Sequence, residues 1–227
     1  MPATRGLVVR RLLIALAVVV ALLVGVNVAV TSWAQAQLAG RAQARSNAAS
    51  ASAGLGDFPV LYRILATGTV PRLGIQLHGV PLGPVTLSAL DLSLQGVAIS
   101  RHDLVEGRGV RLGDITSGTI RATVSASQLT AALGQPVRLL ADGTARIEVA
   151  GHPVPVVPVV TAAGELSFRL PPGADVALRI RPRAFLPCID AVRVGAGTLT
   201  MVCSVRHLPP ALTRALARLS AAPGHAM

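Results

Sequence analysis

The sequence predicts a mostly β domain of the α+β class behind an N-terminal transmembrane helix. One apolar stretch, residues 12–30, interrupted only by Asn27, lies close to the N-terminus. After it, apolar and polar residues alternate with period two in segment after segment, which is the pattern of half-buried strands. The turns between these segments are short, so we expect an antiparallel sheet of hairpins with two or three short helices.

The apolar stretch has the length of a membrane span. Its 19 residues, Leu12 to Val30, match the ~20 that a helix needs to cross the hydrocarbon core. Arg5, Arg10 and Arg11 precede it without a nearby acid, and such a positive bias keeps the N-terminus inside. We therefore expect a cytoplasmic segment 1–11, an anchor 12–30 and an extracytoplasmic C-terminal domain, which makes a single-pass protein of the cell membrane.

A cleaved signal peptide is the alternative. Ala34-Gln35-Ala36 has the small-x-small pattern that signal peptidase cuts. The apolar region of a signal peptide is usually ~7–15 residues long, shorter than this stretch. The sequence therefore favours the anchor, and cleavage after Ala36 stays open.

The charge of the chain is strongly positive. Its 21 basic residues are all arginine, and with 10 acids the net charge is +11. An exported domain of this charge is attracted to an anionic membrane surface. Only one Trp, one Tyr and three Phe are present, and the arginines are spread over the predicted strands. Nucleic-acid binding, which uses stacked aromatics or a basic stripe, is disfavoured.

Composition divides the exported part into three. Residues 31–56 are rich in Ala, Ser and Gln and predict a tether, helical in its first half and flexible from Ser46 to Gly56. Residues 57–220 are enough for one domain with a real core, and residues 221–227 form a tail. No internal linker and no fixed-period repeat divides the domain.

The predicted strands follow the alternating residues. A one-residue phase slip near Ala89 indicates a bulge. His152 to Val160 contains three prolines, which predict an edge strand or a loop. The strands are expected over 85–95, 97–99, 120–125, 145–149, 166–170, 176–180, 192–194 and 199–205.

Three short helices are expected. Phe58 to Thr67 places Leu61, Ile64 and Leu65 on one face, with Pro59 in the first turn and Gly68 as a stop. Residues 127–133 have Ser127 as an N-cap and Gly134 after the last turn. Residues 209–220 form an amphipathic pattern.

An ordered series of short motifs carries a family resemblance, although none of them is chemically diagnostic alone. The chain resembles the actinobacterial LmeA-like phospholipid-binding proteins, long catalogued as a domain of unknown function, from about Gly56 to Leu216. The series comprises Phe58-Pro59-Val60-Leu61, Thr67-Gly68-Thr69, Leu73 to Leu77, Gly79-Val80-Pro81, Leu87 to Val97, Thr116 to Ile120 and Ser127-Gln128-Leu129.

The resemblance implies a periplasmic or cell-envelope protein with an elongated, curved sheet around helices, like the tubular lipid-binding folds. It also implies phospholipid binding in an apolar groove and a role in lipoglycan biogenesis. The chain departs from the family where a strand leads into Gly-Phe-Pro-Phe-Leu: Asp57 separates Gly56 from Phe58, and Val60 replaces the second Phe. Whether the family's first strand is present stays open.

A phospholipid needs a slot lined by aliphatic side chains, because each CH₂ taken from water contributes ~0.8 kcal/mol. Arg63 or Arg72 is expected at the rim, facing phosphate. The competing interpretation is ordinary core for the aliphatic residues and solvated surface for the arginines. The candidate lining residues are Phe58, Leu61, Leu92, Leu94, Ile120, Val124, Leu178 and Ile180.

Cys188 and Cys203 are the only cysteines. In an exported domain they predict one disulfide, worth ~3 kcal/mol in the chain-entropy model, that clamps the hairpin around Gly195. The segment Ser100-Arg101-His102-Asp103 contains triad residue types, but the chain has no G-x-S-x-G elbow. The histidines lack metal-ligand spacing and no Gly-rich loop has a nucleotide-binding setting. We expect no catalytic residue, no metal and no cofactor.

Two functions remain. The favoured one is a membrane-anchored lipid-binding or lipid-shuttling protein whose partners are phospholipid, or another envelope lipid, and the membrane. The alternative is an envelope interaction protein with a filled β core that binds a protein or the cell-wall polymer through its basic face. The first needs a long apolar cavity, whereas the second is packed like any interior. An unrecognised enzyme is the remaining possibility.

Overall fold

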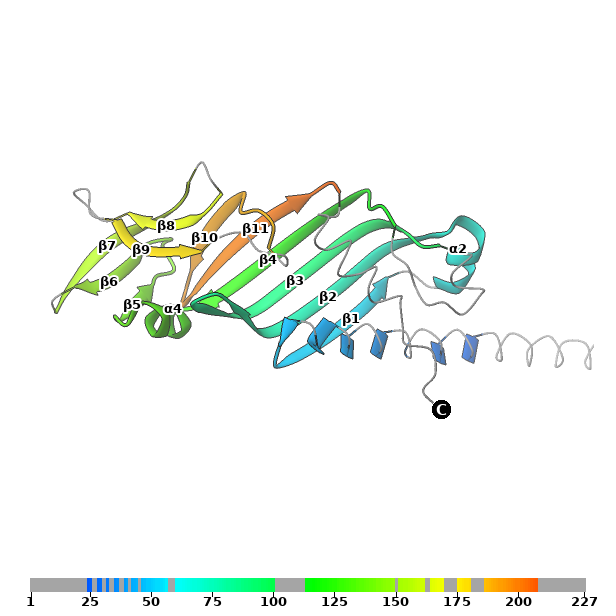
Figure 1. The fold of residues 1–227 in the computed structure, drawn as a ribbon, viewed down its shortest axis with the longest axis horizontal. Helices are drawn as coiled ribbons and strands as arrows, with labels where there is room; N and C mark the ends of the chain where they lie inside the picture. Colours follow the sequence, from blue (N-terminus) through cyan, green and yellow to red (C-terminus); the bar gives the residue numbers. More distant parts are fainter. Residues whose placement is uncertain are drawn as a thin grey trace, which may run out of the picture.

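The fold is described from a computed structural model of the full chain (Figure 1). The structure describes residues 24–25, 28–29, 32, 35–36, 39–40, 42–44, 46–56, 60–100, 113–149, 151–161, 164–169, 175–180 and 186–207. Most of the predicted anchor 12–30, the predicted helix 209–220, the tail and the segment 101–103 lie outside these residues. None of the helices within the described residues is both long enough and apolar enough to cross a membrane.

A six-stranded antiparallel sheet forms the larger part of the elongated molecule (Figure 1). Its strand order is β1-β2-β3-β4-β11-β10. The strands are β1 (Ser50–Gly56), β2 (Thr69–Leu82), β3 (Val85–Ala98), β4 (Ser117–Ser125), β11 (Thr198–Val205) and β10 (Ala191–Gly195).

A five-stranded antiparallel sheet lies at one end of the first sheet (Figure 1). The mostly β, antiparallel prediction is therefore confirmed, but the strands form two sheets rather than one curved sheet. The order is β5-β6-β7-β8-β9, with β5 (Val137–Leu139), β6 (Ala145–Val149), β7 (His152–Val160), β8 (Leu166–Arg169) and β9 (Asp175–Ile180).

The second sheet is inserted between two neighbouring strands of the first. β4 pairs with β11 over eight residue pairs, from Thr198↔Ser125 to Val205↔Gly118, and β5 to β10 all lie between them in the sequence. The short turns predicted a meander in which each strand pairs with the next. That pattern fails at two connections, from β4 to β5 and from β9 to β10, because no local turn signal reports a pairing between strands so far apart in sequence.

The hairpin of β2 and β3 keeps one register but shifts its buried face twice. The pairs 79/88 and 71/96 are absent from an otherwise continuous ladder. Gly79 (φ 67°) and Gly96 (φ 60°) supply left-handed backbone at these two levels, which glycine adopts without a steric penalty. Both strands shift at the same level, so they kink together and the register continues. The phase slip predicted near Ala89 is confirmed, and it takes this paired form.

Polar side chains bridge the kink beside Gly79. Nδ1 of His78 lies 3.2 Å from the carbonyl oxygen of Ser88. The Ser88 hydroxyl donates to the carbonyl oxygen of Thr123 on β4 at 2.8 Å. These contacts hold β2, β3 and β4 together where the regular ladder is interrupted.

The prolines of β7 predicted an edge strand or a loop, and this prediction is wrong: β7 lies in the middle of its sheet. Residues 152–156 pair with β6 and residues 157–160 pair with β8. Successive backbone nitrogens of a strand point to opposite edges. The nitrogens of Pro153 and Pro155 point to the β8 side, where β8 does not pair with this half of β7. The nitrogen of Pro158 points to the β6 side, where β6 does not pair with the other half. No proline therefore removes a ladder hydrogen bond.

The chain enters the sheet earlier than composition predicted. Residues 50–56, expected in the flexible part of the tether, form β1 and pair antiparallel with residues 72–78 of β2. Small Ser, Ala and Gly side chains mask the alternation from which strands are predicted. The first strand, whose presence the sequence left open, is present.

Two helices pack on the sheets. The first, α2 (Val60–Thr67), ends as predicted at Gly68, whose N–H donates to the carbonyl oxygen of Ile64 at 2.9 Å. The second, α4 (Ala126–Leu133), ends at Gly134 as predicted (φ 68°). Its N-cap is Ser125 rather than the predicted Ser127, because Ser125 and Gln128 form a reciprocal capping box.

One glycine joins the two sheets. Gly197, in the turn between β10 and β11, donates its N–H to the carbonyl oxygen of Leu139 on β5 at 2.9 Å. Its carbonyl oxygen accepts from the N–H of Ala126, the first residue of α4, at 2.9 Å. Buried residues of both sheets belong to one apolar core.

The paired kinks predict a strong effect of Gly96→Ala. An alanine there would need φ near +60°, and its Cβ would overlap the side chain of Thr116. We expect a loss of about 2 kcal/mol or more in the free energy of unfolding, measured by urea denaturation. Gly54→Ala in β1 is the matched control, since a Cβ there meets nothing within 4 Å. Equal stability of the two variants would contradict this account of the kink.

Candidate functional site

One face of the six-stranded sheet, which we call the inner face, is apolar across four adjacent strands. Facing residues form rows that run across β2, β3, β4 and β11. All of these side chains are buried except Ile75, which is partly buried. The rows are Ile75, Leu92, Ile120 and Cys203; Leu77, Leu90, Ala122 and Met201; and Leu73, Leu94, Gly118 and Val205.

The structure brings four of the predicted lining residues onto this face. Leu92 faces Ile120 directly across β3 and β4, and Leu94 occupies the next row. Val124 lies further along β4, opposite Leu199. Their exposed fractions are 8% for Leu92, 3% for Leu94, 1% for Ile120 and 0% for Val124.

Small residues alternate with large ones along β4. On the inner face, Ile120 lies between the small residues Gly118 and Ala122. A Cβ at Gly118 would stand 2.7 Å from Leu94 Cδ2 and 2.8 Å from Val205 Cγ2, so the neighbouring side chains already occupy this space. Glycine at this position lets β3 and β11 side chains close over β4.

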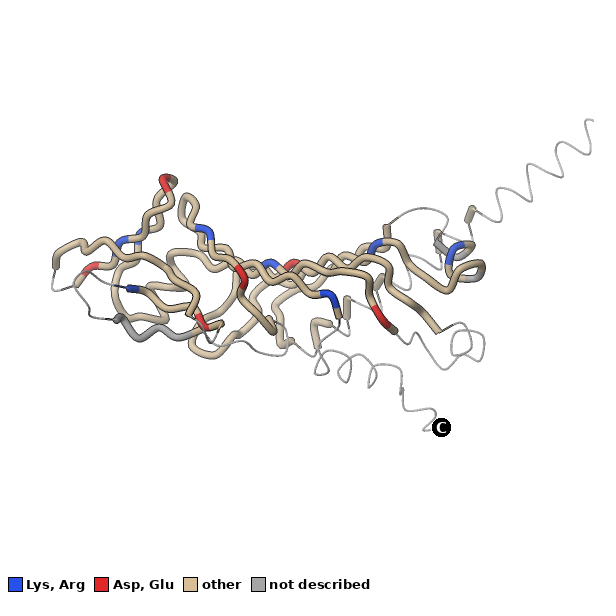
Figure 2. The backbone as a smooth tube through the Cα atoms, turned by 90° about the horizontal axis from the view of Figure 1, so that it is seen from above, with Lys and Arg blue, Asp and Glu red and all other residues tan. Residues whose placement is uncertain are grey.

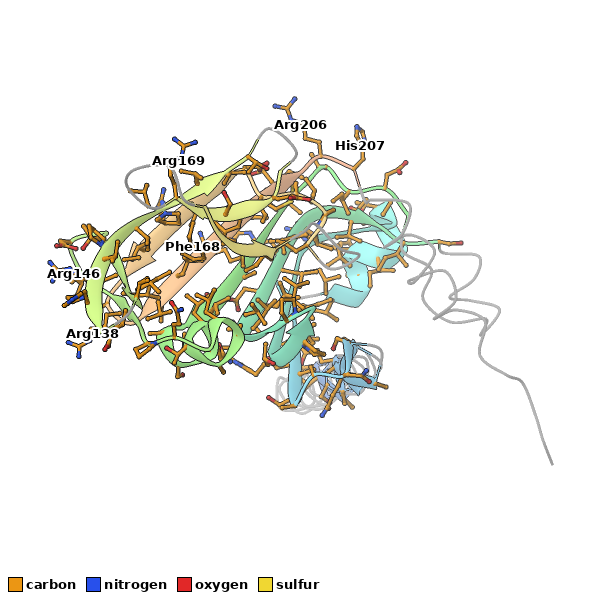
Figure 3. All side chains as sticks on the ribbon, turned by 60° about the vertical axis from the view of Figure 1, so that its left-hand side comes forward. Arg138, Arg146, Phe168, Arg169, Arg206 and His207 are labelled. Atoms are coloured by element: carbon orange, nitrogen blue, oxygen red, sulfur yellow. A yellow bond between two sulfur atoms is a disulfide. The ribbon has the colours of Figure 1, made fainter. Side chains whose placement is uncertain are left out.

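The second sheet contributes further buried apolar residues. Ile180, another predicted lining residue, is 1% exposed on β9 and pairs with Leu166 of β8. Phe168 is fully buried and points into the interior, away from the solvent-facing arginines (Figure 3). Sequence reasoning did not propose Phe168. Its strand was recognised from the Leu166-Phe168 alternation, but only the sheet arrangement shows that this strand borders the common core.

The other three predicted lining residues cannot be assigned to the inner face. Leu61 lies within α2 and Leu178 within β9, while Phe58 falls outside the described residues. Sequence reasoning also missed most of the β2 contribution. Leu73, Ile75 and Leu77 alternate visibly, and this alternation is the signal by which that strand could have been found.

The two predicted phosphate contacts lie at the α2 end of the sheet. Arg63 is exposed on α2, beside Tyr62, which is 70% exposed. Arg72 is exposed near the start of β2, where it pairs with Gln95 and Gly56. Leu73 is buried on the inner face, so Arg72 lies on the outer face. The structure therefore places both arginines at one end without placing Arg72 over the apolar surface.

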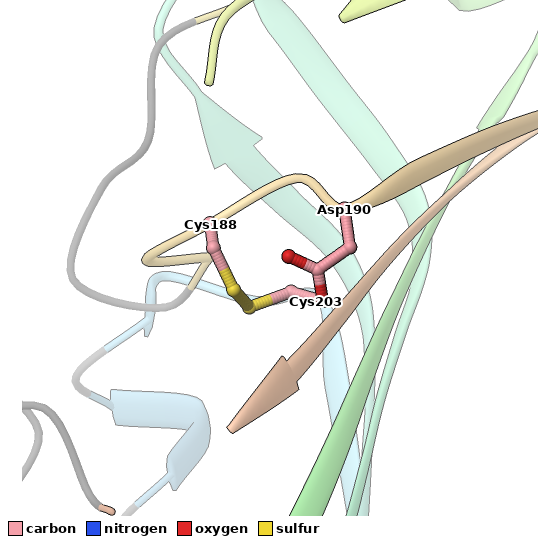
Figure 4. A group of neighbouring side chains, drawn as sticks. All are labelled: Cys188, Asp190 and Cys203. Carbon is pink, nitrogen blue, oxygen red and sulfur yellow. A yellow bond between two sulfur atoms is a disulfide. The ribbon is translucent and has the colours of Figure 1, made fainter. Parts of the chain in front are cut away.

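A disulfide attaches residues 186–189, which we call the strap, to β11 on the inner face. Cys188 and Cys203 are bonded, with Cα atoms 5.3 Å apart, as predicted (Figure 4). Cys203 is fully buried in the row that contains Leu92 and Ile120. Leu186 and Ile189 on either side of Cys188 are 0% and 4% exposed. The disulfide therefore holds an apolar segment against β11 on the inner face.

Asp190 strengthens this attachment. Its Oδ2 accepts the N–H of Ser204 at 2.6 Å, and its own N–H donates to the carbonyl oxygen of Val202 at 2.8 Å. The carboxylate and both sulfur atoms lie within 4.8 Å of one another (Figure 4). With both sulfurs bonded to each other, only the carboxylate is available as a ligand, and the group acts as a structural clamp.

Comparison with protein families identifies the domain. The model of the LmeA-like phospholipid-binding family matches residues 26–219. The chain belongs to this family. The match covers both sheets, α2 and α4, so the LmeA-like domain includes β1 and the inserted second sheet. No curated protein and no solved structure matches the chain significantly.

The family assignment agrees with the resemblance that the ordered motifs carried. The LmeA-like family is described as phospholipid-binding. Its members are thus defined by a ligand with long apolar chains and a phosphate headgroup. The inner face supplies an apolar surface that extends over several strands, which is the chemistry that such chains require.

The strap predicts a measurable role for the disulfide. Replacing Cys188 and Cys203 together by serine should lower the free energy of unfolding by about 3 kcal/mol, since a loop of this length loses its constraint in the unfolded chain. Urea denaturation with and without reductant measures this difference. Under reductant the wild-type chain should approach the stability of the double variant. A variant as stable as the oxidised protein would show that the strap is held without the bond.

Proposed function

We propose that this chain is a membrane-anchored, extracytoplasmic phospholipid-binding protein without enzymatic activity. It holds or shuttles lipid during cell-envelope lipoglycan biogenesis. The family assignment supports phospholipid as the ligand. The apolar run at residues 12–30, with arginines before it, supports the anchor and the orientation.

The alternation of β4 is the observation that carries this proposal. Its inner positions are Gly118, Ile120, Ala122 and Val124, all buried, whereas Arg121 between them is exposed. The neighbouring strands repeat this separation, so the described inner face carries no charged side chain across β2, β3, β4 and β11.

Binding to such a surface stabilises acyl chains, because it removes them from water. Each CH₂ removed from water contributes about 0.8 kcal/mol, so two long chains gain more than a small polar ligand of similar mass could. The gain is non-directional, which fits a surface built from aliphatic side chains without hydrogen-bonding groups. The headgroup remains in water at one end, because burying a phosphate without partners costs far more.

We place the headgroup at the α2 end. Arg63 and Arg72 are both exposed there, and guanidinium groups bind phosphate through paired hydrogen bonds. Tyr62, the single tyrosine of the chain, is 70% exposed beside Arg63. An exposed tyrosine next to an arginine suits the interface between lipid headgroups and water.

The second candidate is an envelope interaction protein with a filled core. The observation that favours it is the near-complete burial of Leu90, Ile120, Met201 and Phe168. A filled core of this kind is packed like other protein interiors. The two candidates therefore differ in whether lipid reaches the inner face.

Photo-crosslinking distinguishes them. The full chain is incubated with a phospholipid that carries a photoreactive group on its acyl chain, and the adducts are mapped by mass spectrometry. We expect adducts at inner positions such as Leu92, Leu94 and Ile120. Arg121 and Thr123, outer positions of the same β4 strand, provide the internal control. Adducts confined to outer positions, or no adducts with lipid also absent from native mass spectra, would favour the filled core.

The headgroup placement gives a separate prediction. Arg63→Gln with Arg72→Gln should weaken binding of an anionic phospholipid by about fivefold per arginine, with a smaller effect on a zwitterionic one. Competition between the two lipids, followed by native mass spectrometry, measures the ratio. Arg121→Gln, which removes a charge from the outer face of β4, should leave the ratio unchanged. If Arg121→Gln changed the ratio as much as the double variant, Arg63 and Arg72 would not be the specific contacts of the headgroup.

A further inference from the structure

The outer face of the second sheet carries a stripe of arginines and exposed apolar residues. Arg138 of β5 faces Arg146 of β6, and Arg146 faces Pro155 of β7. Two residues further along β7, Val157 faces Arg169 of β8. All five side chains are exposed, and Val157 is 61% exposed. We call these five residues the distal stripe.

The stripe points away from the core. Arg138, Arg146 and Arg169 extend outward from the second sheet, opposite in direction to Phe168 (Figure 3). The register agrees, because Phe168 pairs with Pro158 whereas its neighbour Arg169 pairs with Val157. The stripe is therefore one continuous outer surface that crosses four strands.

The two facing arginines of this stripe repel each other, and Glu148 in the same pocket offsets part of this repulsion. Like charges directly opposite each other across two strands destabilise a sheet. Arg138 and Arg146 also line a pocket of about 210 Å³, together with Pro136, Ile147, Glu148, Gly151 and Pro153. A phosphate group that entered this pocket would relieve the repulsion between the two guanidinium groups and accept hydrogen bonds from both.

Acidic residues flank the stripe: Asp175 of β9 is directly opposite Arg169 in the register, and Glu148 lines the same pocket as Arg138 and Arg146. Glu148 is two residues beyond Arg146 on β6, on the same face, and is opposite Pro153. Asp142 lies in the turn between β5 and β6, where Thr144 donates to it from its hydroxyl at 2.7 Å and from its N–H at 2.9 Å. These hydrogen bonds, followed by the charge of Arg146, hold the pKa of Asp142 below its usual value. None of these acids interrupts the row from Arg138 to Pro155.

The stripe lies at the opposite end of the molecule from α2. Figure 1 shows the second sheet at one extremity and α2 at the other, with the described helical residues that precede β1 extending toward the α2 end. Charged positions are spread along the length of the backbone (Figure 2). A chain held at its N-terminus would therefore present the stripe to a second surface.

We propose that the distal stripe docks on an anionic phospholipid membrane. Arginines beside exposed apolar residues suit this partner, because the guanidinium groups bind headgroup phosphates while Val157 and Pro155 contact the interfacial region. The inference goes beyond lipid binding on the inner face and does not require it. Together with an N-terminal anchor, docking at this end would bridge two membranes.

Vesicle capture tests the proposal. The full chain is fixed to a sensor surface through an N-terminal affinity tag, which leaves the distal stripe facing solution. Vesicles of phosphatidylcholine, alone or with added phosphatidylglycerol, are passed over it. We expect a strong preference for the anionic vesicles that disappears at high salt, since exposed charges are screened there.

Matched variants assign the preference to the stripe. Arg138→Gln with Arg146→Gln should lower the affinity for anionic vesicles by about 25-fold, which corresponds to a surface charge effect of about 1 kcal/mol for each arginine. Arg121→Gln with Arg193→Gln removes the same charge from exposed positions of the first sheet and should change it far less. Circular dichroism confirms that both variants are folded.

Other outcomes would overturn the proposal. An equal loss in the two double variants would show that total charge, not the stripe, attracts the membrane. Displacement of the vesicles by inorganic phosphate at matched ionic strength would assign the pocket to a soluble anion. Unchanged vesicle capture by Val157→Asn would contradict the proposed contact of Val157 with the membrane. Unchanged capture by Arg138→Gln with Arg146→Gln would show that the stripe does not bind the membrane. Photo-crosslinking of the inner face is unaffected by any of these results, so the two proposals fail separately.

Discussion

The pairing of β4 with β11 is the constraint on which the rest of the structure depends. It joins residues 118–125 to residues 198–205 and thereby closes the long segment that forms the second sheet. Without it, the β10–β11 hairpin would lose its connection to the other four strands of the first sheet. The cost of closing so long a segment grows only with the logarithm of its length, so one extended ladder is enough to hold the inserted sheet in place.

The same ladder generates the apolar surface. Because side chains alternate between the two faces of a strand, pairing four strands in register aligns their aliphatic positions into continuous rows. A slip of one residue between β4 and β11 would turn Ile120 and Val124 away from Cys203 and Leu199. Fold and proposed function thus rest on one requirement, that the inner face of every strand be apolar at the same levels. The paired kinks at Gly79 and Gly96 preserve this alignment while the long hairpin bends.

The two ends of the molecule differ in chemistry. The α2 end carries Tyr62, Arg63 and Arg72, whereas the opposite end carries facing arginines, Arg138 and Arg146, next to exposed proline and valine. The apolar inner face lies between these two ends. The disulfide and Asp190 attach the strap to β11 on that surface, so the part of the chain nearest the inner face is held most firmly.

Much of this protein is determined by its sequence alone. The strands β3, β4, β6, β8, β9, β10 and β11, the C-terminal ends of both helices, the disulfide and the family could be predicted, because alternation, capping residues and cysteine count act locally. Leu92, Leu94, Ile120, Val124 and Ile180 are buried in the structure, and their role as lipid-lining residues stays a prediction. Only the tertiary structure decided the rest. β1 was not predicted because its small side chains show no clear alternation of apolar and polar residues. β7 was not predicted as a central strand because of its three prolines, which are tolerated since β7 pairs with β6 in its first half and with β8 in its second. The division into two sheets, and the meeting of Arg138 with Arg146, depend on pairings between distant strands, which are fixed by the packing of the whole chain and leave no mark in any short stretch of sequence.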